Sequence, residues 1–415
     1  MNKLKLTGLE RAWILYDVGN SAFVLMVSTL IPIYFNAISD SAGLSSTEYL
    51  AYWGYATSIV TLIVAVLGPV LGTVADTRGY KKPVFLASVL VGVAGCLALG
   101  LTQAWLVFLV IFIVAKVGYS SSLVFYDSMI GDVTPDERMD DVSSRGYAWG
   151  YIGSCVPFVV CLALVLGSGV IGMSQMTAMT IAFIITAVWW LGMTLPLLRG
   201  YRQTHYVEAA RSHVVRESFA RIWNTLKNAR REKEVFLFLL AFFCYIDGVY
   251  TIIDMATAYG TALGLDTTGL LLALLVTQIV AFPSALAFGR LSGKYSSRTL
   301  IPVCIAAYTG IAVFAFFLDS QLKFWILAVI VGMFQGGIQA LSRSHFAKII
   351  PQEKSGEYFG LFDICGKGAS FLGTMLISVT SQVTGSANLG VGMLAILFVV
   401  GLVLFLVSCR CLETA

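Results

Sequence analysis

The stretch Gly72-Thr73-Val74-Ala75-Asp76-Thr77-Arg78-Gly79-Tyr80-Lys81-Lys82 is a short polar turn between two long apolar runs. Residues 51–75 precede it and residues 83–103 follow it, so each run is long enough to cross a hydrocarbon layer of about 30 Å as a helix. A carboxylate at a helix end, such as Asp76, can hold nearby cations and the N-terminus of a neighbouring helix. The stretch therefore predicts two membrane-spanning helices joined by a charged turn.

Similar apolar runs recur along the whole chain of 415 residues, which is 58% hydrophobic and only 12% charged. A soluble protein of this length carries about twice that charged fraction. Because lipid offers no partner to unpaired backbone groups, the runs should be helices, and the fold an all-α integral membrane bundle. We predict twelve spans, at 12–37, 51–75, 83–103, 105–130, 146–168, 175–197, 235–262, 267–291, 299–318, 323–347, 357–382 and 385–408.

The basic residues predict the orientation of these helices. Of the 27 Lys and Arg, all but Lys116, Lys323 and Lys367 fall in segments on the side of the 72–82 turn. Basic loops stay in the cytoplasm, so both termini should be cytoplasmic. We therefore expect a multi-pass protein of the plasma membrane, the inner membrane if the source is bacterial.

The longest polar stretch, residues 198–234, divides the chain into an N-terminal half (1–197) and a C-terminal half (235–415), each with six predicted helices. Apolar residues from Val215 to Leu226 recur at helical spacing between basic ones, which predicts an amphipathic linker helix. The halves echo each other: Tyr16-Asp17-Val18-Gly19 resembles Tyr245-Ile246-Asp247-Gly248. Two pseudo-symmetric six-helix bundles with a site at their interface are the architecture of many secondary transporters.

Seven ionisable residues lie inside the predicted spans besides Arg290, Lys323, Arg343, His345 and Glu357 toward span ends. None of the seven lies in the third, sixth, ninth or twelfth span. A charge at the bilayer centre costs at least about 2.5–3.5 kcal/mol, so such residues face protein or a water-filled cavity. Their distribution predicts a polar path through the bundle, lined by helices 1, 4, 7 and 11. The seven are Asp17, Lys116, Asp127, Asp247, Asp254, Asp363 and Lys367.

Both signs of charge near the midplane suggest a site for a zwitterion, with an ammonium near Asp247 and a carboxylate near Lys116 or Lys367. The alternative is that Asp247 and Lys367 pair and only fix two helices together. Asp17 and Asp247, as the repeated pair, are the candidate proton carriers. Asp17 could instead hydrogen-bond the backbone near Gly19.

Uncharged side chains can also bind a solute. Gln278, Gln335 and Gln339 could hydrogen-bond it, although contacts between helices are the commoner use of such residues. Arg343 is a candidate contact or a side chain that snorkels to the surface. The sequence shows no metal-ligand set, cofactor motif or nucleic-acid signature, so we expect no metal and no cofactor.

The 72–82 stretch resembles the inter-helix signature of the major facilitator superfamily, Gly-x3-Asp-Arg-x-Gly-Arg-Arg/Lys, with Thr77 in place of the usual Arg. The matching turn of the second half, residues 289–298, has Gly293 where the Asp would stand. The resemblance implies a conformational gate. Its residues here would be Gly72, Asp76, Arg78, Gly79 and Lys81.

Longer strings resemble the vacuole-effluxer-like family of that superfamily. They are Tyr16–Phe23, Gly146–Gly153, Asp247–Thr251, Gln335–Ser344, Tyr358–Gly360 and Gly366–Lys367. The resemblance covers nearly the whole chain and implies a twelve-helix transporter, with Asn20, Tyr126 and Thr251 among the residues near the solute. Asp127 and Asp363 depart from the family pattern, and both add negative charge.

These observations predict a secondary active transporter of a small polar or zwitterionic, amino-acid-like solute, coupled to protons or another ion. We expect the protein to lie in the lipid bilayer, to act as a monomer and not to be an enzyme. An uncoupled facilitator, an exporter of organic anions or drugs, and a non-transporting sensor or scaffold are the alternatives.

Overall fold

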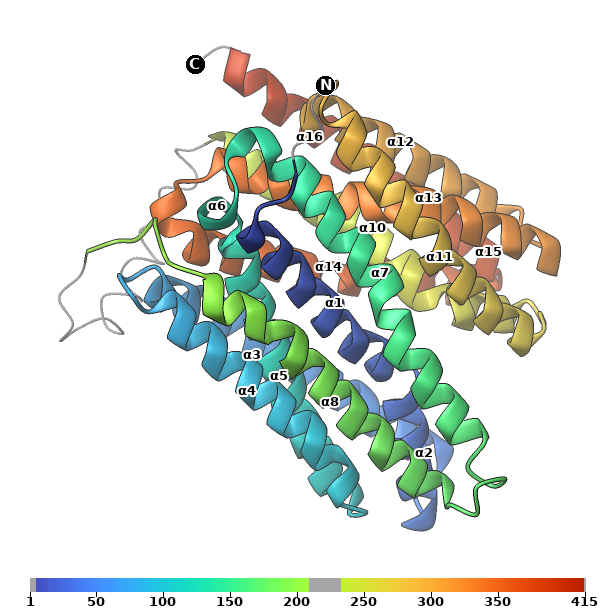
Figure 1. Ribbon diagram of the computed structural model, residues 1–415. Helices are drawn as coiled ribbons and strands as arrows, with labels where there is room; N and C mark the ends of the chain where they lie inside the picture. Colours follow the sequence, from blue (N-terminus) through green and yellow to red (C-terminus); the bar gives the residue numbers. More distant parts are fainter. Residues whose placement is uncertain (1–4, 209–232, 414–415) are drawn as a thin grey trace.

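A computed structural model describes residues 5–208 and 233–413, and almost all of this part is helical. Two bundles are joined by the chain between α8 and α10 (Figure 1). The first holds α1 (Gly8–Ser28), α2 (Leu30–Ser41), α3 (Ser46–Ala75), α4 (Lys81–Ala98), η1 (Leu99–Leu101), α5 (Trp105–Ser128), α6 (Ile130–Val133), α7 (Asp136–Leu166) and α8 (Gln175–Gly200). The second holds α10 (Lys233–Ala262), α11 (Thr267–Leu291), α12 (Ser297–Phe316), α13 (Gln321–Ile349), η2 (Gln352–Lys354), α14 (Ser355–Thr384), α15 (Ala387–Gly392) and α16 (Leu394–Glu413).

Within the described residues, eleven helical segments are long and apolar enough to cross a membrane. With α14, a helix of 30 residues, they match the twelve that the apolar runs predict. The fold is an all-α, twelve-helix membrane bundle in two halves. The amphipathic helix expected in the linker lies in 209–232, outside the described residues.

The first predicted span is interrupted at Thr29, between α1 and α2. Pro32 lacks the N–H that would bond the carbonyl of Ser28, so the helical ladder cannot continue there. The hydroxyls of Ser28 and Thr29 donate instead to carbonyls of the preceding turn. The span is thus one membrane crossing made of two helical pieces.

Four helices lie on the outside, and they are the third, sixth, ninth and twelfth predicted spans. In the described part of the chain, α4, α8, α12 and α16 pack mainly on elements of their own half. The halves meet chiefly through α3 with α14 and through α7 with α11 and α13. The absence of the seven charges from these four outer helices agrees with contact to lipid. The charges do not mark the whole interface, because α3, α7, α11 and α13 carry none of the seven and still form most of it.

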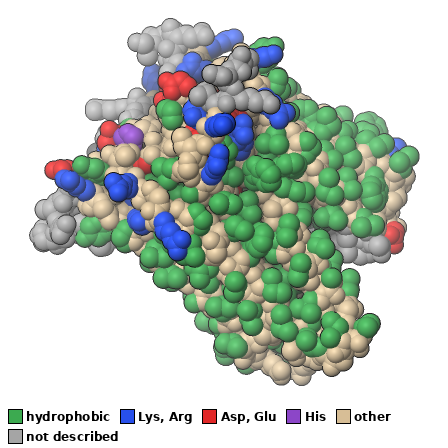
Figure 2. All heavy atoms as spheres, viewed as in Figure 1, with side chains coloured by type: hydrophobic (Ala, Val, Ile, Leu, Met, Phe, Trp, Pro, Cys, Tyr) green, Lys and Arg blue, Asp and Glu red, His purple; other side chains and the backbone are tan. Residues whose placement is uncertain are grey.

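One end of the molecule carries the α3–α4 turn, residues 201–208 and both described chain ends, and we call it the linker side (Figure 1). Toward the opposite end the two bundles spread apart. In the face shown in Figure 2, Lys and Arg side chains gather at the linker side, and the rest of the surface is mainly hydrophobic. A wide apolar surface above a basic end is what a membrane-embedded bundle presents.

Candidate functional site: an interface between two halves

On the linker side, Asp76 of the first half caps a helix of the second half. Its Oδ1 accepts the N–H of Gly356 at 2.7 Å and its Oδ2 accepts the N–H of Glu357 at 2.9 Å. Both donors belong to the first turn of α14, whose N–H groups lack partners within the helix. The carboxylate thus meets the positive end of the α14 dipole, and only 1% of Asp76 is exposed.

Glycines permit this approach. A Cβ at Gly72 would lie 2.2 Å from the carbonyl oxygen of Gly356, and a Cβ at Gly356 would lie 2.5 Å from that of Gly72. No side chain fits between the two backbones at this point. α3 and α14 therefore meet as bare backbone, which brings Asp76 to the end of α14.

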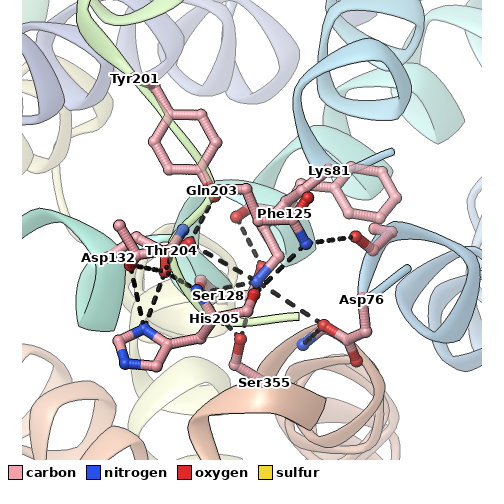
Figure 3. A network of polar contacts seen from close by, with 12 residues as sticks. Asp76, Lys81, Phe125, Ser128, Asp132, Tyr201, Gln203, Thr204, His205 and Ser355 are labelled. Atoms are coloured by element: carbon pink, nitrogen blue, oxygen red, sulfur yellow. Dashed lines mark hydrogen bonds and ion pairs between the residues drawn. The ribbon is translucent and has the colours of Figure 1, made fainter. Parts of the chain in front are cut away.

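Lys81 completes the contact (Figure 3). The side chain is fully buried, and its ammonium lies 3.6 Å from Asp76 and 3.9 Å from Asp132. It also donates to Ser355 Oγ, at the start of α14, at 2.8 Å. One lysine thus links two carboxylates of the first half to the helix end of the second half.

Burial raises the pKa of Asp76 to about 7, although Lys81 and the two N–H groups of α14 act in the opposite direction. For Asp132, burial also acts to raise the pKa. The attraction of Lys81 and the hydrogen bonds from Thr204, Tyr201 and His205 outweigh it, so the pKa of Asp132 is lowered. The two carboxylates around one ammonium are therefore electrostatically unequal.

Residues 201–208, which follow α8, pack against the α3–α4 turn and α6, and we call them the strap. Tyr201 donates to Asp132 Oδ2 at 2.5 Å, and Thr204 and His205 contact Oδ1 of the same carboxylate (Figure 3). Val207 pairs with the backbone of the α3–α4 turn, where its N–H donates to the carbonyl of Asp76 at 2.8 Å. The start of the linker is thus fixed to the same turn that holds α14.

Two residues of the expected gate face this strap. Arg78 is largely exposed, pairs with Glu208 at 3.1 Å and stacks on Tyr206. Gly79 has φ +82°, which favours glycine, and its N–H donates to the Gln203 side chain at 2.9 Å. Gly72, Asp76 and Lys81 thus lie at the contact with α14. Arg78 and Gly79 instead contact residues 201–208 at the start of the linker.

A second interlock surrounds Arg343 of α13. Its guanidinium lies 3.0 Å from Asp127 of α5 and 3.6 Å from Asp17 of α1, and it donates twice to Ser143 of α7 at 3.0 Å. Tyr126 holds Asp17 through a hydrogen bond of 3.1 Å. Four predicted residues from both halves thus form one cluster, the Arg343 cluster.

The alternative that Arg343 snorkels to the surface is wrong. Its side chain is 2% exposed and lies against the rings of Trp13, Tyr126 and Tyr147, at 4.6, 5.5 and 4.3 Å from the ring centres. A guanidinium stacks on aromatic faces while its N–H groups remain available for acceptors. The acceptors come from the other half, at more than 190 positions' distance along the sequence, which helix-end reasoning could not anticipate.

Asp247 of α10 is fully buried against α14. Its Oδ1 accepts the N–H of Gly373 at 2.9 Å and the hydroxyl of Thr251 at 3.2 Å. Its Oδ2 is buried with no hydrogen-bond partner among the described residues. Gly373 is needed here, since a Cβ would lie 2.2 Å from Thr251 Oγ1.

Asp254 lies seven residues further along the same face of α10, about 10 Å away. Its side chain is exposed, and Lys116 of α5 is the opposite charge that acts on it. Lys116 in turn lies over the ring of Tyr119 at 4.9 Å. These two opposite charges thus come from different halves, in segments with membrane-spanning composition.

This arrangement changes the expected zwitterion site. The sequence predicts an ammonium site at Asp247, but α14 covers that carboxylate completely. Asp254 is the accessible carboxylate of α10, and sequence reasoning named it without giving it a role. Depth along a helix could be estimated from the sequence, but the covering by a neighbouring helix could not.

The remaining predicted residues fall into separate places. Gln278, Gln335 and Thr251 line one cavity in the second half. Gln339 accepts the Tyr151 hydroxyl at 2.7 Å across the interface. Asn20 donates to the carbonyl of Tyr16 on its own helix at 3.0 Å.

Lys367 lies on α14, but its side chain is outside the described part, so its proposed pairing with Asp247 stays a prediction. Sequence reasoning missed Asp132, Ser143, Tyr201 and Ser355. These are ordinary polar residues in turns or at helix ends, without a motif of their own.

Comparison with known proteins places this architecture in a family. The family model described as "Vacuole effluxer Atg22 like" matches residues 46–136 and 132–410. The MFS-type transporter YxiO of Bacillus subtilis (strain 168) is 43% identical over 96% of this chain and 94% of its own length. Autophagy-related protein 22 of Kluyveromyces lactis is 25% identical over 71% of this chain and 63% of its own length.

Solved structures share the fold at low sequence identity. The human organic anion transporter MFSD10 (TETRAN) superposes with a TM-score of 0.73 at 12% identity, over 96% of this chain and 98% of its own. FucP in its outward conformation gives 0.72 at 14% identity, over 97% of both chains. The resemblance that the sequence motifs indicate is thereby confirmed.

Proposed function

Because the chain belongs to the vacuole effluxer Atg22-like family of major facilitator transporters, we propose that it is a secondary active transporter of a small polar or zwitterionic, amino-acid-like solute. Membrane transport follows from the relatives and the fold. We infer the solute class, the coupling and the side on which the protein closes from the arrangement of its charged residues.

The observation that carries the proposal is the uneven interface between the halves. On the linker side the halves interlock through Asp76 on α14 and through the Arg343 cluster. Asp254 of α10 is exposed, and Lys116 of α5, in the other half, is the opposite charge that acts on it. A transporter that closes one side while the other admits solute needs this difference.

Lys116 and Asp254 are the proposed receptors for the two ends of a zwitterion. The ammonium would attract the carboxylate of the solute, and Asp254 would attract its amino group. Since the two receptors belong to different halves, a bound solute would bridge them and favour closure. Neither receptor alone would do so.

Asp247 is the proposed coupling residue. An ionised carboxylate with an unpartnered, buried oxygen is costly, whereas the protonated acid tolerates burial. Rearrangement of α14 would uncover Asp247 and let it exchange a proton. Asp17 is the second candidate, because Arg343 pairs with two carboxylates and would leave both when the halves separate.

The orientation follows from charge. The linker side carries the basic residues and should face the cytoplasm, with both termini there. The described state would then be closed to the inside. The membrane would be the plasma membrane, the inner membrane in a bacterium, and the single chain would act as a monomer.

The test is uptake into proteoliposomes, with and without an inward proton gradient, for a panel of zwitterionic, anionic and cationic solutes. We expect gradient-driven accumulation of a zwitterion. Asp247→Asn should abolish accumulation but leave exchange, because Asn keeps the shape and cannot cycle a proton.

Charge specificity is tested by Lys116→Ala and Asp254→Asn, which should each weaken uptake strongly. The matched control is the exposed pair Asp319 and Lys323 at the start of α13, where Asp319→Asn and Lys323→Ala should be silent. Downhill flux that ignores the gradient would indicate an uncoupled facilitator. Absence of any flux in folded protein would favour a sensor or scaffold.

A further inference from the structure

An apolar cavity lies inside the second half, between α10, α11 and α13, and reaches α15. It encloses about 60 Å³, and its walls include Ile252, Met255, Leu274, Phe324, Leu327 and Val331. A water molecule needs at least about 10–15 Å³ on this measure, so the space holds roughly four to six water-sized atoms. That is the size of a small branched or cyclic hydrocarbon group.

One polar atom of this cavity has no partner. Gln335 is 5% exposed and lines the cavity, and its Oε1 makes no hydrogen bond within the described part of the chain. The other hydroxyls of the lining are satisfied: Thr277 donates to Ala328, Tyr259 to Ala315 and Thr251 to Asp247. A buried acceptor without a donor is costly, so the cavity is incomplete as it stands.

The cavity adjoins the charged face of α10. Thr251, in its wall, donates to Asp247, while Ile253 and Met255, also in the wall, flank Asp254 in sequence. An apolar space next to the proposed charge receptors would receive the uncharged part of a molecule held there. This placement connects the cavity to the solute path.

We propose that this cavity is a specificity subsite for the cargo and that Gln335 is the residue that selects among cargos, an inference that rests on the proposed transport function. The subsite takes an apolar group of up to about six non-hydrogen atoms. Oε1 of Gln335 accepts a hydrogen bond from an N–H or O–H of the same molecule. Hydroxyl-rich solutes are rejected, since most of their donors would find no acceptor among apolar walls.

The experiment uses three small probes on the purified full chain in detergent, read as a shift in melting temperature over a concentration series. 3-Methylbutylamine combines the apolar group with a donor. 4-Methylpentanoate has a similar apolar group, and its carboxylate carries no donor. Ethanolamine has donors without the apolar group. We expect 3-methylbutylamine to bind at least tenfold more tightly than the other two.

Two variants locate this binding. Gln335→Leu should weaken 3-methylbutylamine at least tenfold and leave 4-methylpentanoate unchanged or tighter. Ala328→Phe, which fills the cavity, should remove binding of both, and the milder Val331→Leu should weaken both in case the larger change prevents folding. The control is Ile326→Phe, an exposed position of α13 where binding should stay as in the wild type.

The proposal is overturned if no probe stabilises the wild-type protein, if ethanolamine binds as well as 3-methylbutylamine, or if the folded Ala328→Phe protein binds like the wild type. Binding in detergent is read without a gradient. If the probes do not bind as expected but gradient-driven uptake is intact, the subsite proposal is wrong and the transport proposal stands. If the probes bind with the expected selectivity but no solute is taken up, the transport proposal is wrong instead.

Discussion

The α3–α4 turn and its counterpart between α11 and α12 both bring two helices together at a glycine, but they differ in the charged groups at the contact. At the first, Gly72 lets α3 touch α14, and Asp76 caps that helix with two hydrogen bonds. At the second, Gly289 lets α11 approach Ser144 of α7, and Gly293 stands where the carboxylate would be. Close packing is thus repeated in both halves, but the charged cap belongs to the first.

This difference indicates which contacts stabilise the linker-side-closed state relative to an open one. Close packing of small residues allows two helices to touch but also to slide apart at modest cost. A buried carboxylate on a helix N-terminus has a defined geometry and is lost altogether on separation. We infer that the first-half turn, with the Arg343 cluster behind it, contributes most of the stability of the linker-side-closed state.

The largest expected effect comes from a methyl group at the first turn. Gly72→Ala would place Cβ 2.2 Å from a backbone oxygen of α14, which no side-chain rotation can relieve. It should destabilise the closed state by about 3 kcal/mol, the upper range for overpacking. Gly289→Ala meets the Ser144 side chain at 2.9 Å and should cost less.

Both glycine variants can be compared by labelling a cysteine at Ala340, which is completely buried and whose carbonyl accepts the Ser143 hydroxyl across the interface. Ala340→Cys should react quickly in the Gly72→Ala background and slowly in the Gly289→Ala background. Equal reactivity in the two backgrounds would show that the halves contribute alike.

A smaller effect is expected at the Arg343 cluster. Arg343→Lys keeps the charge but cannot contact Asp127, Asp17 and both Ser143 acceptors from one planar group. The closed state should lose on the order of 2 kcal/mol. Arg290→Lys at the exposed end of α11 is the matched control and should be silent. The labelling rate of Ala340→Cys measures both, and an unchanged rate in Arg343→Lys would remove the cluster from the account.

The pH dependence should be smaller still. The pKa of Asp76 is raised to about 7 in the closed state, from an ordinary value near 3.8. Between these values the closed state holds a proton that an open, solvated Asp76 has lost. Raising the pH through this window therefore favours opening. From pH 6 to 8 the closed state should lose about 1.4 kcal/mol, or tenfold in population.

Asp132 does not contribute in this window, because its pKa is lowered and it stays ionised throughout. The measurement is the labelling rate in a His205→Gln background, which removes the imidazole beside Asp132. The slope should vanish when Asp76→Asn is added. A slope that survives Asp76→Asn would assign the pH effect to another group.

Much of this fold could be predicted from the sequence, because membrane helices follow from apolar length and orientation from basic residues. The role of Asp76 near a helix N-terminus could be predicted from its place at a helix end, but its partner, α14, lies 280 residues away. The strap of residues 201–208 could not be predicted. It has no periodicity, and its contacts with Asp132 depend on where the chain returns.

The residues of the candidate site could be predicted from the sequence, but most of their contacts could not. Asp247 and Asp254 share one face of α10, yet α14 covers the first and leaves the second exposed. Arg343 looked like a surface side chain because its acceptors come from the other half. Sequence gives the depth of a residue along its helix, whereas partners across the interface depend on how the two halves meet.

The central claim, that Asp76 on α14 holds the linker side closed, is tested most directly by a distance measurement between the halves. Spin labels at Asp136→Cys and Lys354→Cys lie on exposed linker-side positions of the first and second half, outside the described network. Accessible native cysteines would be replaced first. In the wild type we predict one short distance population.

In Asp76→Asn a single oxygen must serve two N–H donors of α14, and the amide N–H₂ meets one of them. Because the amide N–H₂ cannot accept, one buried N–H of α14 loses its partner, which costs about 2 kcal/mol and should move a large fraction of molecules to a longer distance. Asp141→Asn, on α7 where Gly289 of α11 approaches, should leave the distribution unchanged. An unchanged short distance in folded Asp76→Asn, or an equal shift in Asp141→Asn, would contradict the account.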